Sequence, residues 1–261
     1  MKIKFTKMVA SGNDFVVVES LPSGLPLPSL ARKICDRRFG VGADGLLILK
    51  QTSPGVIRMR IFNSDGSEAQ MCGNGARSAA IYATKKDIKI MTLAGIIEAK
   101  VNASTARIKL PEPKNIKLDI PIKVSARKLA VNFINTGVPH TIIFVAQIDK
   151  INVKDIGNQV RYHKKFFPAG ANVDFVEVLS RDSLNIRTYE RGVEDETLAC
   201  GTGSVASALV FALKTGISGK VNVHTKGGEI LKVSFKKDNN QFSDIWLEGR
   251  VEVVYKGEYH V

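Results

Sequence analysis

The chain has few of the residues that build disulfide frameworks or membrane spans. Its 261 residues include three cysteines and one tryptophan. An odd number of cysteines without framework spacing predicts a reducing compartment, of which the cytoplasm is the simplest. Apolar runs are short, and charged residues interrupt the amino-terminal segment, so we expect no membrane span, no membrane partner and no secretory signal.

Negative charge is also scarce, because 38 lysines and arginines face 25 acidic residues for a net charge of +13. The basic residues are spread along the chain without a basic tail, zinc-finger spacing or the aromatic–basic interleaving of RNA-binding sheets. We interpret the charge as a solvated surface and expect no nucleic-acid partner. The alternative is a catalytically silent protein that binds nucleic acid through a basic face, and salt-dependent retention of DNA or RNA without enzymatic activity would favour it.

Two of the cysteines lie in nearly identical settings. Cys72 stands in M-C-G-N-G-A and Cys200 in A-C-G-T-G-S, each before an alanine-rich run that predicts a helix, over 77–83 and 205–213. Each thiol is thus expected at a helix N-terminus, where unpaired N–H groups favour a thiolate or a bound carboxylate. The third cysteine, Cys35, is expected to be a buried bystander.

The cysteine motifs belong to a longer internal repeat. Residues 5–20 and 163–180 both run from basic residues through Ala, Gly and Asn into Asp-Phe-Val, so that Asp14 aligns with Asp174. Most other segments alternate apolar and polar residues, as half-buried antiparallel strands do. The sequence therefore predicts an α+β fold of two pseudo-symmetric halves, each a curved, mostly antiparallel sheet wrapped around one central helix.

The predicted halves are residues 1–116, which carry Cys72, and residues 117–250, which carry Cys200. Three prolines and no clear period make residues 110–121 the candidate linker. The final strand, 251–261, is a candidate to return to the first half.

Paired thiols suit stereoinversion without a cofactor. One thiolate removes a proton from one face of a carbon, and a thiol on the other face returns one. Backbone N–H groups at Gly73–Asn74 and Gly201–Thr202 could hold a substrate carboxylate and the charge beside the carbanion. A redox disulfide or a single nucleophilic thiol remains open, but neither explains both glycine-rich helix starts. The four scattered histidines and the lack of C-x-x-C argue against zinc, and no lysine lies in a recognisable pyridoxal phosphate context.

Over nearly its whole length the chain resembles the diaminopimelate epimerases. The motifs that carry the resemblance are S-G-N-D-F (11–15), R-R-F-G-V-G-A-D-G (37–45), F-N-S-D-G-S-E (62–68), C-G-N-G-A-R (72–77), N-T-G-V-P-H (135–140), A-N-V-D-F (171–175), Y-E-R-G-V-E-D-E-T (189–197) and A-C-G-T-G (199–203). The resemblance implies interconversion of LL- and meso-diaminopimelate for lysine and peptidoglycan synthesis, no metal, no organic cofactor and a homodimer.

The resemblance also assigns roles to individual residues. It makes Cys72 and Cys200 the acid/base pair, with His140 and Glu190 tuning the thiols. The residues expected to bind the reacting amino acid are Asn13, Gly73, Asn74, Gly201 and Thr202. Those expected to read the distal end of the substrate are Asn63, Asn172, Glu190 and Arg191, the last through two hydrogen bonds to a carboxylate. A core histidine and a structural salt bridge are the structural alternatives for His140 and Glu190.

Two positions depart from the family pattern. Gly45 stands where several members have Gln, and Val138 stands where many have Asn. The second change removes a polar contact near the distal head of the substrate, and a site that loses a hydrogen-bonding partner rejects analogues less well. An amino acid racemase with a relaxed range, for example for glutamate, is therefore the alternative enzyme.

Overall fold

The computed structural model describes residues 2–19, 21–22, 24–125 and 127–261. The chain forms two compact units: Met1–Lys109 with Glu248–Val261, and the continuous segment Leu110–Leu247. The predicted divisions, after residue 116 and after residue 250, lie a few residues from these boundaries. No helix within the described ranges combines the length and the hydrophobicity that crossing a bilayer takes.

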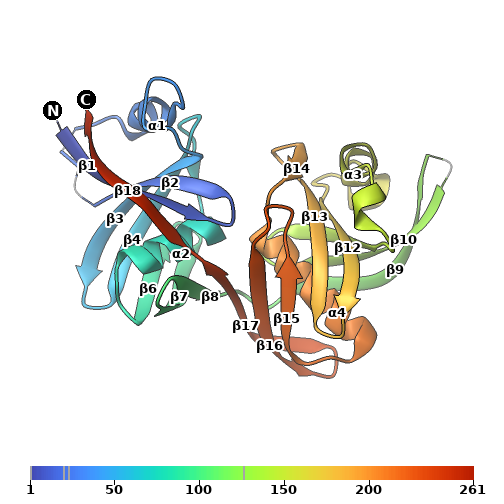
Figure 1. Cartoon of the computed structure of the whole chain (residues 1–261). Coiled ribbons are helices and arrows are strands. Elements are labelled where there is room, and N and C mark those ends of the chain that lie inside the picture. The colour runs from blue at the N-terminus through green and yellow to red at the C-terminus, as the bar shows by residue number, and fades with distance from the viewer. Residues whose placement is uncertain (1, 20, 23, 126) are drawn as a thin grey trace. The chain divides into compact units, whose positions relative to one another are not determined.

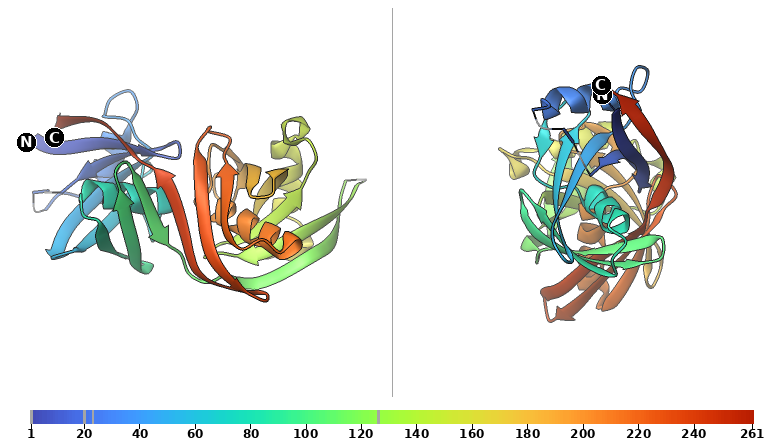
Figure 2. Two further views of the ribbon diagram at one scale, coloured as in Figure 1. Left: turned by 60° about the horizontal axis from the view of Figure 1, so that its bottom comes forward. Right: turned by 90° about the vertical axis from the view of Figure 1, so that its left-hand side faces the viewer.

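The first unit is a curved sheet around a central helix (Figure 1). Its strands are β1 (Lys2–Ala10), β2 (Asn13–Val18), β3 (Gly45–Ser53), β4 (Val56–Asn63), β5 (Glu68–Ala69), β6 (Asp87–Thr92), β7 (Gly95–Asn102), β8 (Thr105–Lys109) and β18 (Glu252–His260). Most of their pairings are antiparallel, and β2–β3 and β4–β6 are parallel. Strand β18 pairs with β1 from Lys2↔His260 onward, so the two ends of the described chain lie side by side (Figure 2).

Two helices complete this unit. The central helix α2 (Gly73–Tyr82) is rich in alanine and glycine, and its residues 74–80 are buried where it packs against β1, β7 and β8. Helix α1 (Leu27–Cys35) is amphipathic and buries Leu30, Ile34 and Cys35 in a cluster with β2 and β3. The expected burial of Cys35 is confirmed.

The second unit repeats this plan. Its strands are β9 (Lys114–Val124), β10 (Arg127–Asn135), β11 (Pro139–Phe144), β12 (Asn172–Ser180), β13 (Ser183–Glu190), β14 (Asp195–Thr197), β15 (Gly219–His224), β16 (Ile230–Asp238) and most of β17 (Gln241–Arg250). Its central helix, α4 (Gly201–Thr215), ends at Gly216 in the left-handed conformation that favours glycine. Helix α3 (Val153–Arg161) lies between β11 and β12 in sequence and packs on β12 and β13. The predicted fold class, with its two sheet-and-helix halves, is confirmed.

The register of the internal repeat differs from the sequence alignment of Asp14 with Asp174. Strand β2 runs parallel to β3 with α1 between them in sequence, and β11 runs parallel to β12 with α3 between them. Strand β2 is therefore the counterpart of β11, and S-G-N-D-F at 11–15 corresponds to T-G-V-P-H at 136–140. The alignment is wrong because N-D-F at 13–15 and N-V-D-F at 172–175 are similar in sequence, but they begin strands β2 and β12, which occupy different positions in the repeat.

The predicted linker 110–121 is mostly wrong. Only residues 110–113 precede β9, whose residues Lys114–Val124 pair with β10. Two of the prolines, Pro111 and Pro113, lie before the strand. Pro121 lies within it, which a strand tolerates where the missing N–H faces away from the neighbour.

Candidate active site

Cys72 is the residue that begins the central helix of the first unit. Its backbone is extended (φ −140°), and its sulfur accepts a hydrogen bond from the Gly75 N–H at 3.5 Å. This is the N-cap arrangement expected from the sequence, and it directs free helical N–H groups toward the space beside the thiol. Cys72 is half-buried, so its thiol is not sealed within the core.

The side-chain amides of Asn74 and Asn13 form a hydrogen-bonded pair whose orientation is fixed by a charged residue on each side. Arg77 can only donate, so the atom that it meets at 2.7 Å is Asn74 Oδ1, and Asn74 Nδ2 then donates to Asn13 Oδ1 at 2.5 Å. Asn13 Nδ2 in turn donates to Asp44 Oδ2 at 3.1 Å. The chain from Arg77 to Asp44 thus sets both predicted substrate-binding amides before any ligand arrives.

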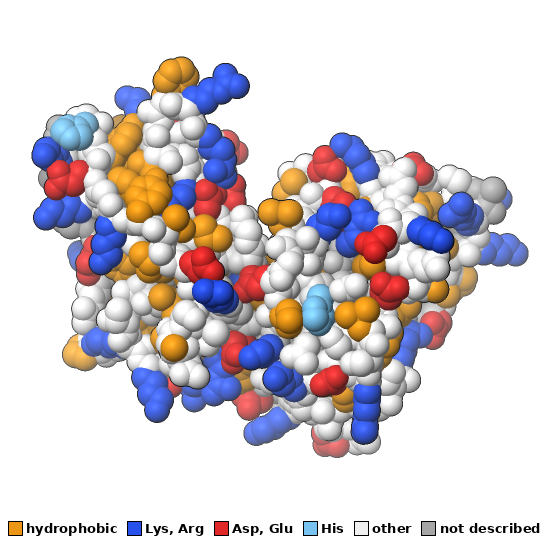
Figure 3. Space-filling view, in the orientation of Figure 1, with side chains coloured by type: hydrophobic (Ala, Val, Ile, Leu, Met, Phe, Trp, Pro, Cys, Tyr) orange, Lys and Arg blue, Asp and Glu red, His pale blue; other side chains and the backbone are white. Residues whose placement is uncertain are grey.

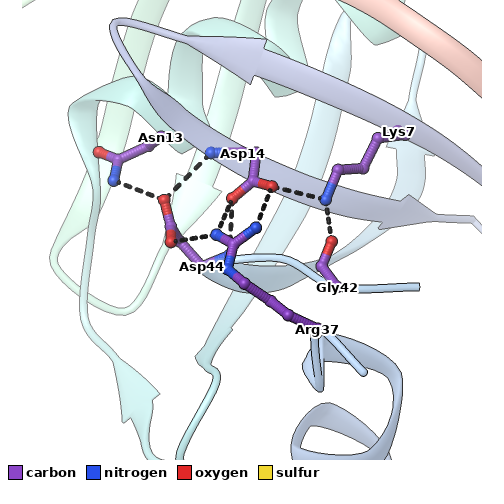
Figure 4. A network of polar contacts seen from close by, with 6 residues as sticks. All are labelled: Lys7, Asn13, Asp14, Arg37, Gly42 and Asp44. Carbon is purple, nitrogen blue, oxygen red and sulfur yellow. Dashed lines mark hydrogen bonds and ion pairs between the residues drawn. The ribbon is translucent and has the colours of Figure 1, made fainter. Parts of the chain in front are cut away.

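Asp44 belongs to an ion cluster that anchors the start of β2 (Figure 4). Arg37 donates to both Asp14 and Asp44 at 2.8 Å, and Lys7 Nζ lies 2.7 Å from Asp14 Oδ2 while donating to the Gly42 carbonyl. Burial would raise the pKa of Asp14, but hydrogen bonds from Arg37 and Lys7 outweigh it and hold that pKa well below its usual range.

Replacing Asp14 with asparagine is expected to lower the free energy of unfolding at pH 7 by about 3 kcal/mol, because it leaves the buried Lys7 without its counter-charge. A carboxyl with a lowered folded-state pKa stabilises the protein above its unfolded pKa near 4 and loses this effect as the pH falls below it. The difference between the wild type and Asp14→Asn should therefore narrow between pH 5 and pH 2. Urea unfolding at each pH measures it, and a constant difference would contradict this account.

Cys200 begins the central helix of the second unit, in deeper burial. Its side chain is 8% exposed. Burial raises the pKa of its thiol, the carboxylates of Glu190 and Asp174 raise it further, and the Thr202 hydroxyl and Gly203 N–H oppose the rise. Burial also raises the pKa of Glu190. The two predicted acid/base thiols thus lie in unequal surroundings.

A chain of hydrogen bonds leads away from the Cys200 thiol. The sulfur lies 3.5 Å from Thr202 Oγ1, which lies 3.0 Å from His140 Nε2. On the other side of the ring, His140 Nδ1 lies 2.7 Å from Asp174 Oδ2, and both residues are fully buried. Thr188 donates to the second oxygen of Asp174 at 2.7 Å. His140 therefore reaches the thiol through Thr202.

The other predicted residues of this unit meet beside His140. Asn172 Nδ2 lies 3.3 Å from His140 Nε2, and Asn172 Oδ1 accepts the Arg191 N–H at 2.7 Å. The Arg191 side chain donates to the Ala169 carbonyl at 3.4 Å and is half-buried, which leaves guanidinium donors for a carboxylate. Gly201 and Thr202 form the first turn of α4, and Glu190 ends β13 next to Arg191.

Asn63 is placed differently from the rest. It ends β4 opposite Gly45, is exposed, and donates to the Ser67 hydroxyl at 3.0 Å. Its expected role in binding the substrate stays a prediction. At Gly45 an added Cβ would lie 3.0 Å from the Phe62 carbonyl oxygen, so this position fits glycine closely.

Sequence reasoning missed the charged residues that support these groups. Asp174 served only as a landmark of the repeat, and the charged residues Arg37, Asp44 and Arg77 were not predicted as part of the site. All lie in or beside the recognised motifs, which was the available signal. Within the described ranges, no group of three His, Cys, Asp or Glu side chains is placed to hold a metal ion.

Comparison with known proteins gives consistent matches along the chain. A family model described as diaminopimelate epimerase matches residues 5–114 and 132–254. The diaminopimelate epimerase of Caldanaerobacter subterraneus subsp. tengcongensis is 40% identical over 99% of this chain and 100% of its own length. That of Methanocella arvoryzae is 42% identical over 100% of this chain and 98% of its own.

Solved structures share the fold at low sequence identity. A phenazine biosynthesis protein of the PhzF family from Bacillus anthracis aligns with a TM-score of 0.74 at 19% identity, over 100% of both chains. A hydroxyproline epimerase from Agrobacterium vitis aligns with a TM-score of 0.65 at 13% identity, over 99% of this chain and 92% of its own.

Proposed function

The chain belongs to the diaminopimelate epimerase family, and on that premise we propose that it interconverts LL- and meso-diaminopimelate by a cofactor-independent mechanism in which Cys72 and Cys200 exchange the α-proton. This reaction would serve lysine and peptidoglycan synthesis. The observation that carries the proposal is that both cysteines occupy the N-cap position of a central helix in a chain that matches the family over nearly its whole length.

The chemistry calls for one thiol on either face of the α-carbon. A thiolate removes the α-proton and the opposing thiol supplies another, which inverts the centre. The carbanion is stabilised by charge delocalised into the carboxylate, which the first-turn N–H groups of α2 and α4 can bind at Gly73–Asn74 and Gly201–Thr202. These N–H groups are fixed by the helices, so they need no rearrangement as charge develops.

We assign the two ends of the substrate to different sets of residues. Asn13 and Asn74 hold the reacting amino acid, and their amides are already oriented by Asp44 and Arg77. Asn172, Glu190 and Arg191 would bind the distal amino acid head, with Asn63 as a further contact. Arg191 suits a carboxylate because its planar guanidinium presents paired donors.

The test is deuterium exchange by the reduced protein on meso-diaminopimelate in deuterated water. The expected result is deuterium at the α-carbon together with formation of the LL isomer. A panel that includes glutamate and other chiral amino acids is run in parallel. It separates a specific epimerase from a racemase whose substrate range is relaxed by the apolar Val138. Absence of both exchange and inversion under reducing conditions would rule the proposal out.

We also propose a homodimer in the cytoplasm. The outer face of β18 leaves Val253 and Val254 about half exposed, and Figure 3 shows apolar side chains gathered over this strand. Large exposed apolar patches mark interaction sites. Sedimentation at micromolar concentration measures the mass, and a monomer that persists there would contradict the dimer.

A further inference from the structure

We propose that, before substrate binds, the proton of the Cys200 thiol leaves through the Thr202 hydroxyl to His140, with Asp174 as the positioning residue that holds the imidazole and stabilises its charged form. This inference rests on the proposed function and deepens it, because it adds a hydroxyl bridge, Thr202, and a positioning residue, Asp174, to the thiol-tuning role that the resemblance assigns to His140. All of the groups involved lie within the second unit.

The contacts form a continuous path. Cys200 Sγ to Thr202 Oγ1 is 3.5 Å, a usual length for a hydrogen bond to sulfur, and Thr202 Oγ1 to His140 Nε2 is 3.0 Å. The Thr136 hydroxyl donates to the Thr202 carbonyl at 3.1 Å and helps to fix this turn. The path is buried, so bulk water does not compete with it at His140 or Asp174.

Neighbouring groups determine which nitrogen of His140 carries the proton. A backbone N–H can only donate, so Asn172 turns its Oδ1 toward Arg191 N and its NH₂ toward His140 Nε2. Nε2 must therefore be an acceptor in the resting ring, and the proton lies on Nδ1, facing Asp174 Oδ2 at 2.7 Å. This is the tautomer in which Nε2 can take a proton from the Thr202 hydroxyl.

The proton transfer balances without any other reactant. Thr202 gives its hydroxyl proton to His140 Nε2 and receives the proton of the Cys200 thiol. The products are a thiolate, an unchanged hydroxyl and an imidazolium whose Nδ1–H stays bonded to the Asp174 carboxylate. The hydrogen bonds then reverse direction: Nε2–H donates to Thr202 Oγ1, whose hydroxyl donates to the thiolate. Asn172 can keep donating to the Pro139 carbonyl at 3.4 Å.

The surroundings explain why Cys200 needs such a base. Burial disfavours a thiolate there most, followed by the carboxylate of Glu190 on β13 and then that of Asp174 on β12. Asp174 touches the His140 ring directly at 2.7 Å, so loss of its charge is expected to destabilise the imidazolium more than it relieves the thiolate. On β11, His140 faces Cys200 through Thr202, and it carries a positive charge once it is protonated. Asp174 favours that imidazolium by direct contact, and Thr188 fixes the orientation of Asp174.

The test follows the reactivity of the Cys200 thiolate, which needs no substrate. Iodoacetamide alkylation is timed from pH 5 to pH 10 and assigned to Cys200 by peptide mass spectrometry. Asp174→Asn keeps the shape and can still bond Nδ1–H and Thr188, but it lacks the charge. We expect the pH midpoint to rise by about one unit and the rate at pH 7 to fall about tenfold. The matched control is Asp182→Asn, an exposed residue of the β12–β13 hairpin, which should keep the wild-type profile.

A second pair of variants tests the path itself. Thr202→Val removes the hydroxyl bridge and should give the same loss as Asp174→Asn, whereas Thr202→Ser should restore the wild-type alkylation profile. Circular dichroism checks that each variant is folded. If Asp174→Asn and Thr202→Val are folded and alkylate Cys200 as Asp182→Asn does, the relay is wrong. Deuterium exchange on meso-diaminopimelate by the wild type, measured separately, decides the proposed function independently.

Discussion

Replacing either Cys72 or Cys200 with serine should lower the rate of diaminopimelate epimerisation by at least about 10²-fold, the lower end of what a positioned acid or base contributes. A serine hydroxyl keeps the size and the hydrogen bonds of the thiol, but it ionises far less readily. Because inversion needs one group on each face of the α-carbon, loss of either thiol should be nearly as damaging as loss of both. Initial rates on both isomers measure the effect.

The two variants should also differ from each other in isotope exchange. Each isomer presents its α-hydrogen to only one of the two thiols. A variant that keeps one working thiol can therefore exchange deuterium, with retention, into one isomer only, and the other variant should show the opposite preference. Cys35→Ala is the control, since Cys35 is buried in the cluster around α1 and burial raises its pKa to about 12. Near-normal turnover by either serine variant would rule out the two-base mechanism.

The second large effect is expected at Gly203, the third residue of α4. A Cβ there would lie 2.4 Å from Asp174 Oδ1 and 3.1 Å from its Cγ. Asp174 cannot yield, because His140 and Thr188 hold its two oxygens in a fully buried site. Gly203→Ala should therefore cost about 2 to 3 kcal/mol of unfolding free energy, as overpacking of a core does. It should also reduce activity by displacing His140.

The repeat supplies the control for this prediction. Gly75 is the third residue of α2, and its added Cβ would meet Leu47 Cδ2 at 3.2 Å and Ile61 Cδ1 at 3.4 Å. These are ends of flexible side chains, and alanine reduces the entropy of the unfolded chain, so Gly75→Ala should change stability by less than about 1 kcal/mol. Equal losses from the two variants in urea unfolding would contradict the role given to the Asp174 oxygen.

The sequence predicted the parts of the fold that depend on local pattern. The alanine-rich runs after Cys72 and Cys200 were identified as helices because glycine and alanine at a helix start, after an extended cysteine, leave a local signature. The α+β class followed from alternating strands. Helix α3 and strands β9 and β10 were missed. Helix α3 is amphipathic but only nine residues long, and β9 carries a proline and three lysines, so these elements gain much of their stability from packing.

The candidate site was predicted to the extent that its residues have characteristic chemistry. The thiols, glycines and amides were named, but the charged side chains that orient them were not. Asp44 and Asp174 act through residues distant in the chain, Asn13 and His140, and only the three-dimensional pairing of β2 with β3 and of β11 with β12 joins them. The error in the repeat register has the same origin, because short sequence motifs do not reveal which strands pair in the sheet.

The pairing of β18 with β1 bears on how the protein is made. During synthesis β1 emerges from the ribosome long before β18, so the first unit cannot close its sheet until residues 252–260 have emerged. The second unit is one continuous segment and can fold earlier, which reverses the usual amino-terminal-first order of domains during synthesis. The thiol that emerges second, Cys200, should therefore be the first to reach its finished surroundings.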